Sequence, residues 1–162
     1  DLWFKHWSFK HVAGQPVTLD PAYPGAPIID HQPIVLIPSI LSLHLTTNTG
    51  AVFGLGKGGK WVFVVISGIA IVVLLFIFSQ SKSHAYGLHI ALGLVLAGAI
   101  GNLYDRLCFN AVRDMLWLFP KTRLWPWIFN IADSALMVGV GVLVLLSWNH
   151  PQQQSDVDKD GD

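Results

Sequence analysis

Three long runs of apolar residues dominate the pattern of this sequence. Residues 61–78 contain no charged side chain, residues 86–104 contain only His89 as a titratable group before the terminal tyrosine, and residues 127–148 contain one charge, Asp133. A helix needs about 20 predominantly apolar residues to cross the hydrocarbon core of a bilayer. Tryptophan and tyrosine stand near the ends of these runs, as they do at membrane interfaces. The pattern therefore predicts three transmembrane helices.

The segments before the first long run predict a helix end, a loop and strands. In residues 1–13, Asp1 and Lys5 have the spacing and order of a favourable helical ion pair. We expect this stub to be the end of a first transmembrane helix whose earlier residues would precede Asp1. Residues 14–35 contain five prolines, which exclude a long helix there. Residues 34–47 alternate partly like a strand.

Residues 48–60 predict a turn and a glycine-rich connection to the first long run. Asn48 and Gly50 are typical turn residues. The segment GLGKGGK, residues 54–60, lacks the spacing of a phosphate-binding P-loop and precedes a membrane helix. We therefore predict no nucleotide site.

Composition agrees with a small membrane protein of one domain. Of 162 residues, 52% are hydrophobic and 12% charged, whereas charged residues make up about 25% of an average soluble domain. Ten basic and ten acidic side chains balance, so nothing indicates nucleic acid as a partner. The single cysteine, Cys108, excludes an internal disulfide and a multi-cysteine metal site.

The alternation of spans and loops gathers the polar residues on one side of the membrane. The chain crosses in residues 61–78, turns in residues 79–85 and returns, so the loop 107–126 lies on the side of residues 14–60. Asp133 would then lie about two turns inside the last helix. The residues that share this side are Asn48, Gly50, Asn102, Arg106, Asp114, Asn130 and Asp133. Charged groups so close to lipid are costly, so their grouping indicates a functional site.

Two aspartates on this side, Asp114 and Asp133, suit acid–base chemistry if they converge. Close carboxylates cannot both ionise at low cost, so one keeps a proton. The ionised group then activates a water, and the protonated group donates to the carbonyl of the substrate, as in aspartic proteases. The sequence does not establish that the two meet, and Asp105 is a third candidate.

Five blocks in a fixed order resemble the bacterial lipoprotein signal peptidases, also called signal peptidase II. They are Asp1 with Lys5, NTGAVF at 48–53, GAIGNLYDR at 98–106, VRDM at 112–115 and FNIADS at 129–134. The resemblance implies a mainly α membrane fold, a four-helix transmembrane bundle with a small extracytoplasmic β-cradle. It also implies an aspartic endopeptidase that removes signal peptides from prolipoproteins by cleaving before a diacylglyceryl-modified cysteine.

The same resemblance assigns roles to residues. Asp114 and Asp133 would be the catalytic pair. Residues that shape the site or bind substrate would be Asn48, Gly50, Asn102, Arg106 and Asn130; structural residues would be Asp1, Lys5 and Asp105, the last holding Arg106. The partners would be lipid-modified prolipoproteins and membrane lipids. The protein would be a monomer without metal or cofactor, in the bacterial inner membrane with its site facing the periplasm.

Three features of the sequence differ from what the family resemblance implies. The family usually has a V-V-D motif followed by an aromatic or aliphatic residue, whereas this chain has Val-Arg-Asp-Met, so we expect Arg113 to lower the pKa values of the pair. The loop 14–35 is longer and richer in proline than usual. The count of lysine and arginine favours a cytoplasmic site, and here we follow the resemblance instead.

Other functions match part of the pattern. A small non-catalytic membrane subunit, or an ion- or proton-conducting helical protein, would also carry aspartate and asparagine within the membrane; a transporter should show repeats or broken helices, which are not seen. A serine peptidase could use Ser134, but no G-x-S-x-G motif or nearby histidine accompanies it. We predict a single peptidase domain in residues 1–148 and a disordered polar tail in residues 149–162.

Overall fold

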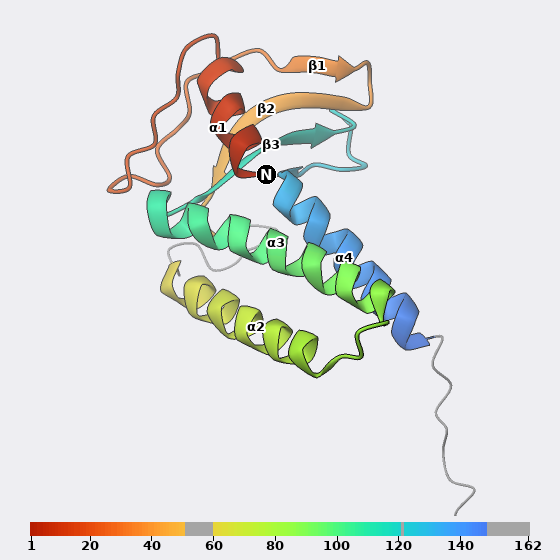
Figure 1. Ribbon diagram of the computed structural model, residues 1–162. Coiled ribbons are helices and arrows are strands. Elements are labelled where there is room, and N and C mark those ends of the chain that lie inside the picture. Colours follow the sequence, from red (N-terminus) through yellow and green to blue (C-terminus); the bar gives the residue numbers. More distant parts are fainter. Residues whose placement is uncertain (51–59, 121, 149–162) are drawn as a thin grey trace, which may run out of the picture.

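The computed structural model describes residues 1–50, 60–120 and 122–148, which form a small sheet at one end of three long helices (Figure 1). The helices are α1 (Leu2–His11), α2 (Lys60–Gln80), α3 (Tyr86–Phe109) and α4 (Ile131–Trp148). The strands are β1 (Ile34–Ile37), β2 (Leu41–Asn48), β3 (Val112–Leu118) and β4 (Ile128–Phe129), and they form one antiparallel sheet in the order β1-β2-β3-β4. The predicted polar tail and most of the glycine-rich segment lie outside the described residues.

The helices α2, α3 and α4 are long and apolar enough to cross a membrane, which confirms the three predicted spans. None of the residues of α2 is buried within the protein, although the helix consists almost entirely of apolar side chains. A continuous apolar surface of this size is stable in lipid rather than in water. Surface-exposed hydrocarbon along α2 therefore identifies the chain as a membrane protein.

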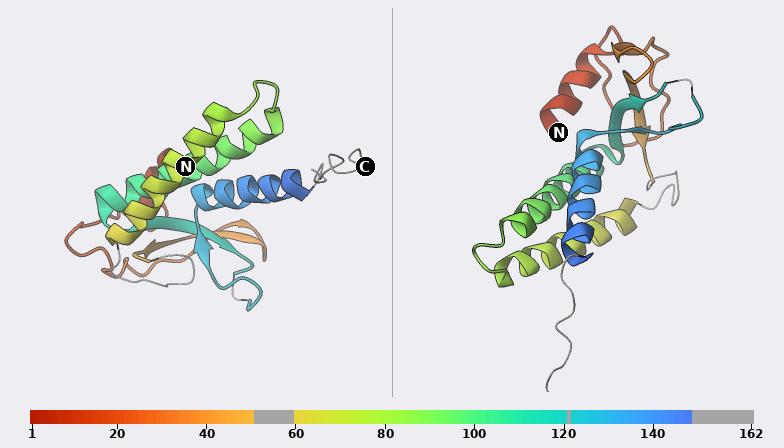
Figure 2. Two further views of the ribbon diagram at one scale, coloured as in Figure 1. Left: turned by 90° about the horizontal axis from the view of Figure 1, so that it is seen from below. Right: turned by 90° about the vertical axis from the view of Figure 1, so that its right-hand side faces the viewer.

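The two ends of the helical part differ, as the predicted alternation of spans requires. The sheet, α1, the end of α3 and the start of α4 lie at one end, and the turn between α2 and α3 lies at the other (Figures 1 and 2). The polar residues of interest therefore lie at the end that carries the sheet.

Two helix boundaries next to the site differ from the prediction. The last helix begins at Ile131 rather than at residue 127, because residues 128–129 pair with β3 as a short strand. Asp133 thus lies in the first turn of α4, and its predicted position two turns inside was wrong. The predicted loop 107–126 contains β3, and α3 continues to Phe109, where Asn110 ends it in the left-handed conformation with φ 58°.

Glycines allow α3 and α4 to approach closely next to the site. A Cβ atom on Gly98 would lie 2.4 Å from the carbonyl oxygen of Ala132, and one on Gly139 would lie 2.7 Å from Cγ2 of Val95. Small residues at such positions let helix backbones come together in a bilayer, where packing replaces the hydrophobic effect. The start of α4 is therefore set against the middle of α3.

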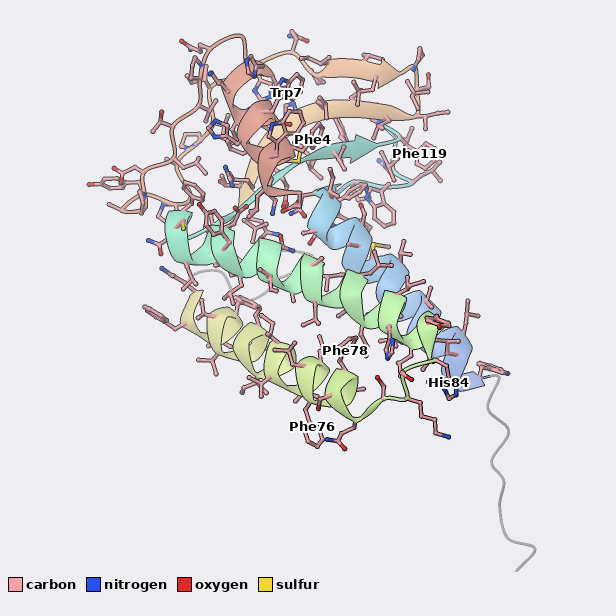
Figure 3. All side chains as sticks on the ribbon, in the orientation of Figure 1. Phe4, Trp7, Phe76, Phe78, His84 and Phe119 are labelled. Carbon is pink, nitrogen blue, oxygen red and sulfur yellow. The ribbon has the colours of Figure 1, made fainter. Side chains whose placement is uncertain are left out.

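The sheet and α1 share a small hydrophobic core. Phe9 of α1 and Val12, which caps the end of that helix, are buried against Leu43 and Leu45 of β2 and Met115 of β3. Phe4 and Trp7, stacked with 5.9 Å between ring centroids, pack against the same core from α1 (Figure 3). This core ties α1 to β2 and β3, and so places Lys5 of α1 near α3.

Candidate active site

The first turn of α4 is closed by two side chains of the FNIAD block. Oδ1 of Asn130 accepts a 2.9 Å hydrogen bond from the backbone N–H of Asp133, and Oδ2 of Asp133 accepts one of 3.2 Å from the backbone N–H of Asn130. This reciprocal pattern is that of a capping box, with asparagine and aspartate in its two positions. The cap fixes the Asp133 carboxylate at the helix N-terminus, where backbone N–H groups stabilise negative charge.

The Asn130 amide links this cap to the strand β3. Its Nδ2 donates to Oδ1 of Asp114 at 2.6 Å and to Oδ1 of Asn102 at 3.2 Å. The Asn102 amide in turn donates from Nδ2 to Oδ1 of Asp133 at 2.7 Å. Asp114 and Asp133 are therefore joined through two amides from α3 and from the start of α4, and the convergence that sequence alone left open is present.

Burial makes Asp114 the carboxyl group that keeps its proton. Its side chain is 2% exposed. Burial, and then the neighbouring Asp133 carboxylate, raise the pKa of Asp114 to about 8, although the Asn130 hydrogen bond acts in the opposite direction. Asp133 accepts two N–H donors, which suit an ionised carboxylate. The burial of Asp114 and the donors around Asp133 therefore suit a pair with one protonated and one ionised carboxyl group.

A second group of charges lies beneath this pair. The Lys5 ammonium has no exposed surface and meets Oδ2 of Asp1 at 2.9 Å, Oδ2 of Asp105 at 3.1 Å and Oδ1 of Asn102 at 3.0 Å. These three acceptors match the three donors of a lysine. The predicted ion pair of Asp1 and Lys5 is confirmed, and Lys5 also contacts the site directly, which the sequence analysis did not anticipate.

Asp105 does not hold Arg106, so that prediction was wrong. Its carboxylate instead accepts from the guanidinium of Arg113 at 2.8 and 3.2 Å, from the backbone N–H of Arg113 at 3.0 Å, and from Lys5. The reason is the alternation of β3: Arg113 and Asp114 are neighbours on a strand, so their side chains point to opposite faces. Arg113 is thus paired with Asp105, and the pKa of Asp114 is raised by burial and by Asp133, so the expectation that Arg113 lowers it was wrong.

Arg106 joins the site to the segment after β2. Its guanidinium donates to the carbonyl oxygen of Gly50 at 3.2 Å and to that of Asn102 at 3.4 Å. The Gly50 N–H donates to Oδ1 of Asn48 at 3.0 Å, closing the turn that the sequence predicted. This chain of contacts reaches the acid pair through Asn102, which also donates to Asp133, so the residues predicted to share one side lie at the same end of the helices.

Two alternatives to the acid pair in the described residues would be a serine nucleophile and a metal site. The Ser134 hydroxyl donates to the carbonyl oxygen of Asn130 within the first turn of α4. Over residues 1–50, 60–120 and 122–148, no group of three or more histidine, cysteine, aspartate or glutamate side chains is arranged to hold a metal ion.

The fold and the site define a class of membrane protein in which two carboxyl groups, the buried Asp114 and the partly exposed Asp133, are linked through side-chain amides where the helices meet a small sheet. The family model of signal peptidase II matches residues 1–149, and the chain belongs to that family of peptidases.

Curated relatives agree with this membership. The lipoprotein signal peptidase of Symbiobacterium thermophilum is 40% identical over 115 residues, covering 71% of this chain and 75% of the relative. That of Shouchella clausii is 44% identical over 112 residues, covering 69% and 72%. That of Pseudomonas aeruginosa is 37% identical over 131 residues, covering 78% of each chain.

Solved structures show the same architecture. Two structures of a bacterial membrane enzyme align with TM-scores of 0.71 and 0.67, at 26% and 27% sequence identity. The first covers 84% of this chain and 82% of the other, and the second covers 81% and 84%. The mainly helical membrane fold with a small sheet, predicted from the sequence, is thus confirmed.

Proposed function

We propose that this chain is an aspartic endopeptidase that removes signal peptides from prolipoproteins, with Asp114 and Asp133 as its catalytic pair. The observation that carries the proposal is that Asn130 connects the two aspartates. Its side-chain nitrogen donates a hydrogen bond to Asp114, and its backbone N–H and side-chain oxygen form reciprocal hydrogen bonds with Asp133. Family membership and the lipoprotein signal peptidases among the relatives support the substrate class.

The chemistry follows from the unequal protonation of the pair. The ionised Asp133 takes a proton from a water while the water oxygen attacks the scissile carbonyl carbon, and the protonated Asp114 gives its proton to the carbonyl oxygen. The resulting tetrahedral diol collapses when its C–N bond breaks. The amine leaves with the proton that Asp133 took, and a diol hydroxyl returns its proton to Asp114. The products are a carboxylic acid and an amine, and the pair regains its starting protonation.

The surroundings suit a lipid-modified substrate. Asp114 lies in β3 and Asp133 in the first turn of the apolar helix α4, so a peptide with an acylated cysteine can keep its lipid chains in the bilayer while its backbone reaches the carboxyl groups. We place cleavage before a diacylglyceryl-modified cysteine on this basis and on the family resemblance. We also propose that a monomer suffices, with the sheet on the periplasmic face of the inner membrane, and that Arg106 with the Asn48–Gly50 turn borders the bound substrate.

Cleavage by the purified chain tests this function. The full chain in detergent, given a diacylglyceryl-modified prolipoprotein peptide, should cut on the amino side of the modified cysteine. Asp114→Asn and Asp133→Asn should each lower the rate by on the order of 10³-fold or more while helix content is kept. Ser134→Ala is the matched control and should retain activity, and a chelator should leave the rate unchanged because carboxylates activate the water.

Two results would exclude the proposal. No cleavage by the unaltered chain would favour a non-catalytic subunit or an ion-conducting protein. A double Asp114→Asn, Asp133→Asn variant that still cleaves near the original rate would locate the chemistry elsewhere.

A further inference from the structure

The proline-rich segment between α1 and β1 is fastened to the rest of the protein at three points. Its Val17 N–H donates to the carbonyl oxygen of Phe9 at 2.7 Å. The carbonyl oxygen of Pro21 accepts from Nδ2 of Asn110, at the end of α3, at 2.5 Å. Nε2 of His31 accepts from the backbone N–H of Leu45 at 3.0 Å. The segment is therefore a fixed wall beside the sheet.

This wall faces a part of β2 that, among the residues the structure describes, is paired with a strand on one edge only. Strand β1 pairs with β2 from Leu41 to Leu43, whereas β3 continues to pair with β2 as far as Asn48. The Leu45 N–H is already bonded to His31, and from Thr46 onward the edge of β2 away from β3 borders a groove of about 500 Å³. The groove is lined by Gly25, Ala26, Pro27 and Ile28 of the wall and by Leu45, Thr46, Thr47, Asn48 and Thr49 of the strand side.

The strand register brings this groove close to the acid pair. Thr46 lies opposite Asp114 in the pairing of β2 with β3. Neighbouring strands are about 4.8 Å apart, so a chain along the open edge of β2 would run roughly 10 Å from the backbone of Asp114. An extended chain covers that distance in about three residues. The groove is thus placed for residues a few positions from the bond that is cut.

We propose that this groove binds the extended segment of the substrate that follows the cleaved bond; the inference rests on the proposed function. A signal peptide is apolar and belongs with the lipid-exposed helices. The groove instead lies beside the sheet and is lined by three threonines and an asparagine. The polar segment that continues outside the membrane matches this lining. Binding along a strand edge uses main-chain hydrogen bonds, so one groove can accept many sequences.

A substitution on the wall can block the groove without altering the acid pair, so it tests the role of the groove alone. Ala26→Trp places a large side chain in the groove from an exposed position of the wall, away from both aspartates. Ala22→Trp is the matched control, since Ala22 is exposed in the same segment and does not line the groove. Neither residue belongs to the acid pair or to the groups that hold it.

Direct binding is the first measurement. A fluorescent peptide of six polar residues, with the sequence that follows the modified cysteine, is titrated against the full chain in detergent. The unaltered chain and Ala22→Trp should bind it equally, and Ala26→Trp about tenfold more weakly or worse. No binding to the unaltered chain at millimolar peptide, or equal binding by Ala26→Trp, overturns the proposal.

The second measurement compares the cleavage of two lipid-modified substrates. One ends a single residue after the modified cysteine, and the other continues for six residues. The longer substrate should have a KM about tenfold lower with the unaltered chain, and Ala26→Trp should abolish that difference without changing KM for the shorter one. An equal effect of Ala26→Trp on both substrates would mean that the groove holds lipid, and overturns the proposal. Peptide binding without any cleavage would instead refute the proposed function and leave the groove assignment standing.

Discussion

Lys5 determines which end of the Asn102 amide faces Asp133. The ammonium carries only donors and lies 3.0 Å from Oδ1 of Asn102, so that atom must be the amide oxygen. The amide nitrogen is thereby directed to Oδ1 of Asp133 at 2.7 Å. A buried cation on α1 thus sets a hydrogen-bond donor for the carboxylate that we propose activates water.

Replacing Lys5 by methionine keeps the length of the side chain and removes the charge. We expect kcat to fall by roughly tenfold to 100-fold with little change in KM, because the amide loses its fixed orientation. The Lys5 ammonium also lowers the pKa of Asp114, so its removal should move the basic limb of the rate profile to higher pH. Lys10→Met, at an exposed position of the same helix, is the control. If Lys5→Met lowers the melting temperature but leaves the pH profile of the rate unchanged, Lys5 only stabilises the fold.

Activity should decline at alkaline pH as Asp114 loses its proton. Because the pKa of Asp114 is raised to about 8 by burial and by Asp133, the form that can protonate the scissile carbonyl disappears above that pH. A plot of kcat/KM against pH, with a short lipid-modified peptide, should therefore show a basic limb centred near pH 8. A rate that stays constant from pH 6 to 10 would contradict the role of Asp114 as the acid.

The Asp114 carboxyl group should also make the free energy of unfolding depend on pH. The raised pKa means that the folded state holds a proton which the unfolded chain releases above its ordinary value of 3.8. Stability from this group is therefore fully present below about pH 4 and is lost as pH rises toward about 8, with a slope of up to about 1.4 kcal/mol per pH unit. Asp114→Asn should remove this slope. Melting temperatures of both forms between pH 5 and 9 provide the measurement, and parallel curves would refute it.

The apolar pattern was sufficient to predict the spans and the shared side of the site, because both depend on local composition and on counting crossings. The strand β3 was not predicted. Its residues include Arg113 and Asp114, both buried, so two ionisable residues occupy positions where a buried strand would ordinarily show apolar ones. Its partner β2 lies about 70 residues earlier in the chain, and no local pattern records such pairing.

The acid pair itself was named from motifs, but its supporting contacts were not. A sequence cannot show that Arg113 and Asp114 point to opposite faces until β3 is known to be a strand. Asp105 was consequently assigned to its chain neighbour Arg106 rather than to Arg113 and Lys5. The start of α4 was placed too early for a similar reason: residues 127–130 are apolar enough to extend the run, yet residues 128–129 pair with the sheet.

The buried charges around Asp105 should behave as a unit. Asp105→Asn leaves Arg113 and Lys5 with less compensation in a buried site, so we expect a loss of about 3–5 kcal/mol in the free energy of unfolding. Arg113→Met should also destabilise, and the double variant should cost less than the two single losses added together. Unfolding of the three variants in detergent measures this coupling. Strict additivity would show that the two residues act independently.

Gly98 should be required for catalysis because it sets the position of α4. A Cβ atom there would lie 2.4 Å from the Ala132 carbonyl oxygen and 2.6 Å from Cγ of Leu136. Both atoms belong to α4, so Gly98→Ala must move that helix and, with it, the cap that holds Asp133. A displacement near 1 Å at a catalytic group can lower the rate by about 100-fold. Gly93→Ala is the control, since nothing lies within 4 Å of a Cβ at that position of the same helix. Cleavage rates of the two variants at equal folded concentration decide the matter; equal rates would show that the helix contact at Gly98 does not position the acid pair.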